Sequence, residues 1–210
     1  MANYCSNTIV FYSKDRMKLA VLLRKINAAC DSRQSGFFSL LVLHGYSKKE
    51  ISGIIDGRDS IISCDSRLTK DQDGDTFSFG VDTETAWSPH VEVFRKILAD
   101  KYENAVRMVY RSEEPGFGIY INSDTEGKYI TDRYMVDCCH FGEYHMEYFD
   151  TFAEAVEWIQ NEYTEVGFSS HDTESDIENK INKLVLQNEE DFFAFHYFEP
   201  DCSNEERKVA

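Results

Sequence analysis

Two cysteines and two histidines lie within eight residues of one another, in a segment with the pattern of a β-hairpin. Cys138, Cys139, His140 and His145 offer the thiolate and imidazole ligands that zinc prefers. Because side chains alternate along a strand, Cys138 and His140 share one face and Cys139 points to the other, so only part of the set can converge. Buried thiols and a hydrogen-bonded histidine are the more ordinary interpretation.

A metal-dependent enzyme of unknown reaction is therefore the alternative hypothesis for this chain. It would use the hairpin from Cys138 to His145 together with Asp132 and Asp137. None of the six histidines lies in a nucleophile elbow, and neither G-x-x-x-x-G-K-[ST] nor G-x-G-x-x-G occurs. We therefore predict no catalytic residue, no metal and no cofactor.

Charge is distributed unevenly along the 210 residues, which carry a net charge of −16. Residues 1–112 hold 16 lysines and arginines and 14 acidic residues, whereas residues 113–210 hold six and 24. An acidic surface of this kind repels nucleic-acid phosphates and attracts basic partners. Selection for solubility is the other interpretation of such a net charge.

The acidic residues of the second half gather around two predicted helices. They are Glu143, Glu147 and Asp150 before the first helix, Glu154, Glu157, Glu162 and Glu165 on or just beyond it, and Asp172, Glu174, Asp176 and Glu178 at the start of the second. Aromatic side chains are interleaved with them: Tyr144, Tyr148, Trp158 and Tyr163. Carboxylates at a spacing comparable to that of DNA phosphates can occupy a basic nucleic-acid channel. For Glu174 and Asp176, stabilisation of the helix dipole is the alternative role.

The first predicted helix has a basic rim that raises a third hypothesis, direct nucleic-acid binding. Its cations are Lys14, Arg16, Lys18, Arg24 and Lys25. In a chain this acidic, such cations more often neutralise the protein's own carboxylates. We therefore predict that the protein does not bind nucleic acid directly.

Apolar residues at helical spacing predict four long helices. Ser13 is expected to cap the first, and Ser88 with Pro89 to begin the second. Thr151, with Glu154 three places on, begins the third by a capping box, and Thr173 with Asp176 begins the fourth, whose apolar stripe ends at Val185.

Alternating segments between these helices predict strands joined mostly by hairpins, one of them turning at Phe141. The sequence thus predicts an α+β protein, with a largely antiparallel sheet and amphipathic helices packed on one face. We expect one domain over residues 1–165 with an insertion at about 31–74. We expect residues 166–210 to form an acidic helical extension on the same core.

Composition limits the cellular setting. The six cysteines have no framework spacing, no secretory leader pattern precedes them, and no apolar run approaches the roughly 20 residues that span a bilayer. We expect a cytoplasmic protein with reduced thiols and no membrane partner.

Three short segments carry a resemblance to a known family. They are Met1 to Asn7 (MANYCSN), Thr85 to Pro89 (TAWSP) and Glu113 to Gly118 (EEPGFG). Together they resemble the YubB-type family with a ferredoxin-like domain, found on bacterial plasmids and phages, over residues 1–30 and 75–165. Ala2 and Tyr4 depart from the Pro and Trp with which that family opens. The resemblance implies a ferredoxin-like fold and a mobile-element origin, and it transfers no catalytic residue because the family has no established activity.

Charge and resemblance together lead to the main functional hypothesis. The chain would be a non-enzymatic binding protein of a phage or plasmid, acting in the cytoplasm of a bacterial host cell. Its acidic second half would occlude a basic nucleic-acid-binding surface of a host protein, such as a nuclease of a restriction or CRISPR defence system. The oligomeric state is left open.

Overall fold

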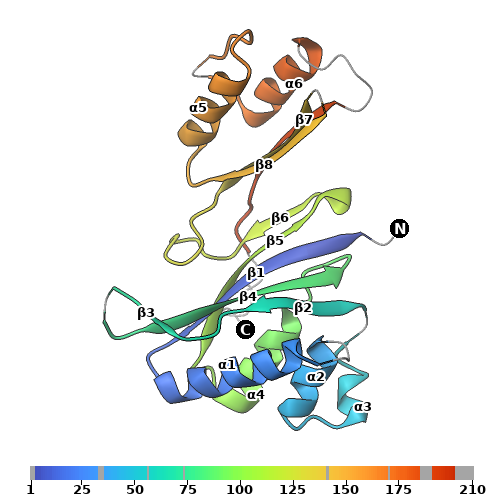
Figure 1. Cartoon of the computed structure of the whole chain (residues 1–210), viewed down its shortest axis with the longest axis vertical. Coiled ribbons are helices and arrows are strands. Elements are labelled where there is room, and N and C mark those ends of the chain that lie inside the picture. Colours follow the sequence, from blue (N-terminus) through green and yellow to red (C-terminus); the bar gives the residue numbers. More distant parts are fainter. Residues whose placement is uncertain are drawn as a thin grey trace, which may run out of the picture. The chain divides into compact units, whose positions relative to one another are not determined.

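The computed structural model describes residues 3–32, 36–55, 57–72, 74–140, 142–169, 171–184 and 191–201. The predicted turn residue Phe141 and the predicted stripe residue Val185 lie outside this set. The protein is α+β and consists of two compact units, Met1–Ile121 and Asn122–Ala210 (Figure 1). No helix among the described residues combines the length and the apolar character needed to cross a bilayer.

The first unit is built on a six-stranded sheet. Its strands are β1 (Tyr4–Ser13), β2 (Asp59–Cys64), β3 (Thr69–Lys70), β4 (Phe77–Ala86), β5 (Arg107–Glu114) and β6 (Ile119–Asn122). The order is β2-β4-β1-β5-β6, with β3 also paired to β4, and β1 is antiparallel to both neighbours. Along the chain, the main elements follow the order β1-α1-β2-β4-α4-β5, where α1 is Arg16–Cys30 and α4 is Glu92–Tyr102, and the strands lie side by side in the order β2-β4-β1-β5. This is the ferredoxin-like arrangement. The predicted fold class is confirmed.

Helices of the first unit cover one face of this sheet (Figure 1). They are α1 (Arg16–Cys30), α2 (Gly36–Leu43), α3 (Lys48–Ile51) and α4 (Glu92–Tyr102). Phe11 from β1 lies 5.2 Å from Phe79 of β4 and 5.4 Å from Phe94 of α4, between ring centroids, and Phe37 of α2 lies 5.1 Å from Phe94. These four buried rings join the sheet to the helices, because aromatic side chains bury the most apolar area per residue.

The segment 31–74, predicted as an insertion, is part of this core. Phe37 and Leu40 of α2 are fully buried, and β2 pairs with β4 at the edge of the sheet. Ile61 of β2 lies opposite Thr83 and is also buried. The segment therefore supplies β2, which the ferredoxin-like arrangement needs, and an additional helix, α2, that is buried in the same core.

Two predicted helix starts are wrong. The N-cap of α1 is Asp15, whose carboxylate accepts from the N–H groups of Met17 and Lys18. Helix α4 begins only at Glu92, after Val91, which makes no capping hydrogen bond through its side chain. Ser88 instead accepts a hydrogen bond at its carbonyl from the Thr85 hydroxyl, which holds it to the end of β4 and outside the helix.

The second unit has a three-stranded sheet of its own, in the order β8-β7-β9. Its elements are β7 (Tyr134–His140), β8 (Glu143–Phe149), α5 (Phe152–Glu162), α6 (Glu174–Leu184) and β9 (Phe192–Tyr197). Val136, Ile159, Ile181 and Phe195 meet in one buried cluster formed by the sheet and both helices.

The unit boundary therefore falls after residue 121, where the sequence predicted one after residue 165. The C-terminal segment is also not an extension of the first core. Strand β9 pairs with β7 over six residue pairs, and α6 packs in the cluster that also contains α5 residues. This long-range pairing between residues 134–139 and 192–197 makes the two halves of the second unit one body.

Candidate functional site

All of the net charge of the chain belongs to the second unit. Residues 1–121 contain 16 basic and 16 acidic residues, whereas residues 122–210 contain six basic and 22 acidic ones. Between residues 150 and 184 there are nine acidic residues and two lysines. We call this segment, with α5 and α6, the acidic layer.

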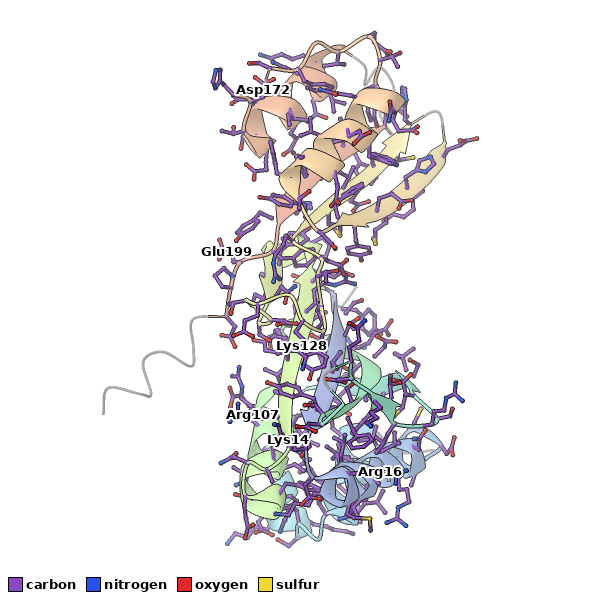
Figure 2. The ribbon with its side chains drawn as sticks, turned by 90° about the vertical axis from the view of Figure 1, so that its left-hand side faces the viewer. Lys14, Arg16, Arg107, Lys128, Asp172 and Glu199 are labelled. Carbon is purple, nitrogen blue, oxygen red and sulfur yellow. The ribbon has the colours of Figure 1, made fainter. Side chains whose placement is uncertain are left out.

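Three carboxylates of the acidic layer are occupied by local structure. Glu154 accepts from the backbone N–H of Thr151 in the predicted capping box, which is confirmed. Asp176 accepts from both the hydroxyl and the N–H of Thr173 at the start of α6. Asp172 (Figure 2) pairs with Lys180, and this hydrogen bond lowers the pKa of its carboxyl group. Glu154 and Asp176 thus stabilise helix starts, as the dipole alternative predicts for Asp176, whereas Asp172 ties the loop before α6 to Lys180.

Other predicted acids of the layer are available to a partner. Glu157 and Glu162 on α5 are exposed and make no ion pair within the described part of the chain. Glu165 is exposed just beyond α5, and Glu174 is half-exposed on α6. Burial raises the pKa of Glu178, one turn after Glu174. The free negative charge is thus concentrated on α5 and at the beginning of α6.

The predicted binding residues of β8 are divided between the two faces of its sheet. Glu147 lies opposite Val136, whose side chain faces the helices, and Glu143 lies opposite His140 on that same side. Tyr144 and Tyr148 pair with Cys139 and Met135 and therefore face the other side of the sheet. Asp150, the remaining predicted binding residue, is exposed in the turn before α5.

The other two aromatic residues near these acids, Tyr163 and Trp158, pack against rings of the second unit itself. Tyr163 is buried and packs edge-on against Phe193. Trp158 is half-buried and lies 6.0 Å from Phe149, between ring centroids. Strand alternation and helix packing therefore divide the predicted acids and aromatic rings between different faces, and their role in binding a partner stays a prediction.

The hairpin from Cys138 to His145 is divided between the two faces, as alternation predicted. Cys138 is 1% exposed and lies opposite His145 in the register of the two strands, whereas Cys139 lies opposite Tyr144 on the other face. Burial raises the pKa of the Cys138 thiol, which disfavours the thiolate that a metal would need. Asp137 lies on the face opposite Cys138, and one of its carboxylate oxygens is buried without a hydrogen-bond partner. Within the described ranges, no three His, Cys, Asp or Glu residues are grouped as metal ligands.

The basic rim of α1 is partly neutralised. Lys18 Nζ lies 3.1 Å from a carboxylate oxygen of Glu103, and Arg16 lies over the Phe77 ring. Burial lowers the pKa of Lys25. These contacts match the expectation that the cations of this helix interact with the protein's own groups.

A buried polar network at one end of β1, β4 and β5 was missed by the sequence analysis. The Asn7 side-chain amide donates to the hydroxyls of Thr83 and Thr85 and accepts from the hydroxyl of Ser112 at 2.7 Å. Cys5 donates its thiol to the same amide oxygen, and burial raises its pKa to about 12. We call these five residues the strand-end network; all are at most 2% exposed.

Two exposed aromatic rings lie beside this network. Trp87 follows β4 directly, has φ of 71°, and is 50% exposed. Its ring centroid lies 5.7 Å from that of Phe117, which is 60% exposed. The buried carboxylate of Glu114 accepts from the N–H of Phe117 and fixes this short 3₁₀ turn (Pro115–Phe117). A bulky residue at positive φ is strained and is kept only where its surroundings fix it.

The signal for this region was present in the sequence. The three segments quoted for the family resemblance are the ones that meet here: Asn3 accepts at its carbonyl from Trp87 N–H, and the Trp87 ring contacts the Phe117 ring. Polar residues at the buried positions of β1 break the apolar alternation that continues with Ile9 and Phe11. The resemblance itself stays a prediction.

Comparison with known proteins gives no family for this chain. No protein-family model matches it, and no curated protein matches it. One similar solved structure is described as that of a "putative glycine cleavage system transcriptional repressor". It shares 10% sequence identity with this chain, with 92% of this chain and 98% of that one covered, at a TM-score of 0.25. A likeness at this level carries no functional argument.

Proposed function

We propose that this protein is a non-enzymatic binding protein whose acidic layer occupies a basic, nucleic-acid-binding surface of another protein. The observation that carries the proposal is the separation of charge between the units, with the whole net charge of −16 in residues 122–210. A field of one sign on one compact unit increases the rate of encounter with a surface of the other sign.

The exposed carboxylates supply the specific part of this interaction. Glu157 and Glu162 are held on a helix whose capping box and buried stripe fix its position on the sheet. Carboxylates placed on a rigid element lose little conformational freedom when they pair with lysines or arginines of a partner. The finer proposal is that the partner is a host defence nuclease and that the gene belongs to a phage or plasmid.

Neutralising three acids of the acidic layer should strongly weaken partner capture. We expect the triple variant Glu157→Gln, Glu162→Gln, Glu174→Gln to recover at least about tenfold less of a nucleic-acid-binding protein than the wild type does. This corresponds to about 0.5 kcal/mol per lost charge pair, within the range for exposed pairs. The measurement is affinity capture from bacterial lysate at about 0.05 M and about 0.5 M salt with quantitative mass spectrometry, since exposed charges are screened at high salt.

A matched control changes the same net charge in the first unit. Asp31→Asn, Glu84→Gln, Glu103→Gln alters three carboxylates there and should leave capture unchanged. The captured protein must also lose nucleic-acid binding when wild-type protein is added. Equal loss in the control, or capture that persists in the acidic-layer variant, contradicts the proposal.

A further inference from the structure

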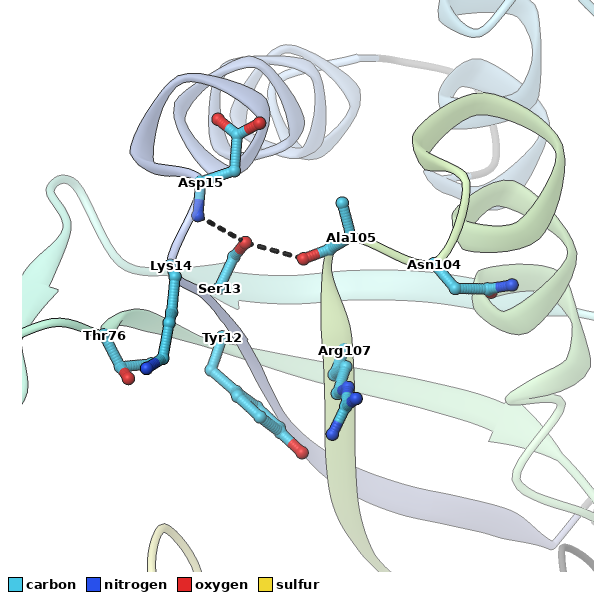
Figure 3. A pocket seen from close by; sticks show the side chains of 8 residues that line it. All are labelled: Tyr12, Ser13, Lys14, Asp15, Thr76, Asn104, Ala105 and Arg107. Carbon is cyan, nitrogen blue, oxygen red and sulfur yellow. Dashed lines mark hydrogen bonds between the residues drawn. The ribbon is translucent and has the colours of Figure 1, made fainter.

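The first unit contains a cavity of about 460 Å³ at the end of the sheet opposite the strand-end network. It is formed where β1 ends, β4 begins and β5 begins (Figure 3). Its lining residues are Tyr12, Ser13, Lys14, Asp15, Thr76, Asn104, Ala105 and Arg107. A volume of this order is typical of small-molecule sites.

A pair of hydrogen bonds fixes the floor of this cavity. The Ser13 hydroxyl donates to the carbonyl of Ala105 at 2.7 Å and accepts from the N–H of Asp15 at 2.9 Å (Figure 3). Ser13 therefore ties the end of β1 and the start of α1 to the loop that leads into β5. Asn104 adopts a left-handed conformation with φ of 56° in this loop. These contacts hold the backbone of the lining segments, whereas the side chains of Lys14 and Arg107 are exposed.

Two cations project from the same side of the sheet. Tyr12 and Arg107 are register partners on β1 and β5, so their side chains share one face. Figure 3 shows the side chains of Lys14, Tyr12 and Arg107 extending in the same direction, and Figure 2 places Lys14 and Arg107 near one another in the first unit. The Tyr12 ring stands between the two cations.

Carboxylates near the cavity leave this positive charge largely uncompensated. Arg107 is exposed and makes no ion pair with any residue that the structure describes. Asp15 uses its carboxylate to cap α1, and in Figure 3 it points away from Lys14 and Arg107. Asp75 lies 3.8 Å from Lys14 Nζ, but both side chains are more than three-quarters exposed, where an ion pair contributes little.

We propose that this cavity binds the phosphate monoester group of a small organic molecule. The planar guanidinium of Arg107 can hold two phosphate oxygens, and the Lys14 ammonium supplies a second, mobile charge. The cavity is several times larger than a phosphate group, so the organic part lies along the Tyr12 ring. Because residues 1–121 carry equal numbers of acidic and basic residues, the first unit does not itself repel a dianion. This site is independent of the acidic layer.

The test is isothermal titration calorimetry of the full chain with adenosine monophosphate as the probe, at about 0.05 M salt. We expect a dissociation constant of about 0.1–1 mM, because the two charged contacts are exposed and each contributes little. Adenosine should bind at least about tenfold more weakly, and inorganic phosphate should compete. Arg107→Ala should weaken binding at least about tenfold, because the phosphate then loses its bidentate, charged hydrogen-bond donor.

Arg24→Ala is the matched control, since it removes an exposed arginine of the same unit on α1. It should leave the dissociation constant unchanged, and circular dichroism should confirm that both variants fold. Equal binding of adenosine and its monophosphate, equal effects of the two substitutions, or no heat of binding at about 10 mM overturns the proposal. Tighter binding of an oligonucleotide without a terminal phosphate also overturns it, because the site would then recognise backbone diesters.

Discussion

Replacing Asn7 by leucine is expected to lower the free energy of unfolding of the first unit by about 3 kcal/mol or more. The substitution keeps a side chain of similar size but removes every hydrogen bond of the amide. The hydroxyl of Ser112 then loses the acceptor that it reaches at 2.7 Å, and the carbonyl of Cys5 loses a donor at 3.1 Å. Each buried polar group left unsatisfied costs about 1–3 kcal/mol.

The two tryptophans make this effect measurable in the full chain, because Trp87 lies in the first unit and Trp158 in the second. In a Trp158→Phe background, urea unfolding followed by the fluorescence of Trp87 reports on the first unit. Thr8→Val is the control: its hydroxyl bonds to Asp82 at an exposed position, so its loss should cost at most about 1 kcal/mol. A similar loss for both substitutions would show that burial of the network adds nothing.

The first unit should also lose stability when the pH falls from about 7 to 4, through His44. This histidine is 5% exposed, and burial lowers its pKa to about 4. Its Nδ1–H donates to the carbonyl of Leu40 at 2.8 Å, so neutral Nε2 accepts from the Tyr102 hydroxyl at 3.0 Å. The ammonium groups of Lys25 and Lys101 disfavour the imidazolium further. The packed pocket therefore favours the neutral ring.

The direction of this change in stability with pH follows from proton linkage. The unfolded chain binds the proton at a pKa of about 6.5 and the folded chain only at about 4, so the stabilisation is complete above pH 6.5 and is lost on acidification. The loss amounts to about 3 kcal/mol, at 1.36 kcal/mol for each pKa unit. Most of it falls above pH 4.5, where the carboxyl groups of Glu50 and Asp100, whose pKa values are lowered in the fold, stay ionised.

Urea unfolding between pH 4.5 and 7.5, again followed by Trp87, measures this dependence. His44→Gln should be less stable at pH 7.5 but should show a much flatter pH profile than the wild type. His145→Gln should leave the profile unchanged because it lies in the other unit. An unchanged slope in the His44 variant would assign the acid sensitivity to other groups.

Local sequence signals predicted the helices well. The apolar residues whose helical spacing predicted the first helix, Leu19, Leu22, Leu23 and Ile26, are buried in α1, and the capping box at Thr151 is present. Such signals work because a helix closes its hydrogen bonds within four residues, and its buried face repeats every three or four. They failed at Ser13, because Asp15 caps the helix instead, and at Ser88, which lies outside the helix with its carbonyl bonded to the Thr85 hydroxyl.

The candidate sites depended more on tertiary structure. The amount of acidic charge in the second half was evident from composition, but which carboxylates stay free was decided by local partners such as Lys180 for Asp172. The faces of Tyr144 and Tyr148 were set by the register of β8 on β7. The cationic cavity joins residues 12–15, 76 and 104–107, which no local pattern connects.

The sequence by itself thus determined the fold class, the four long helices and the sign of the charge on the second half, because these follow from side-chain type and short-range spacing. Only the tertiary structure decided where the chain divides and which polar groups meet. The boundary after residue 121 depends on β9 pairing with β7, and the strand-end network depends on β1 pairing with β4 and β5. Strand pairing joins residues far apart in the chain, and its register depends on the loops and cores that the whole unit closes together.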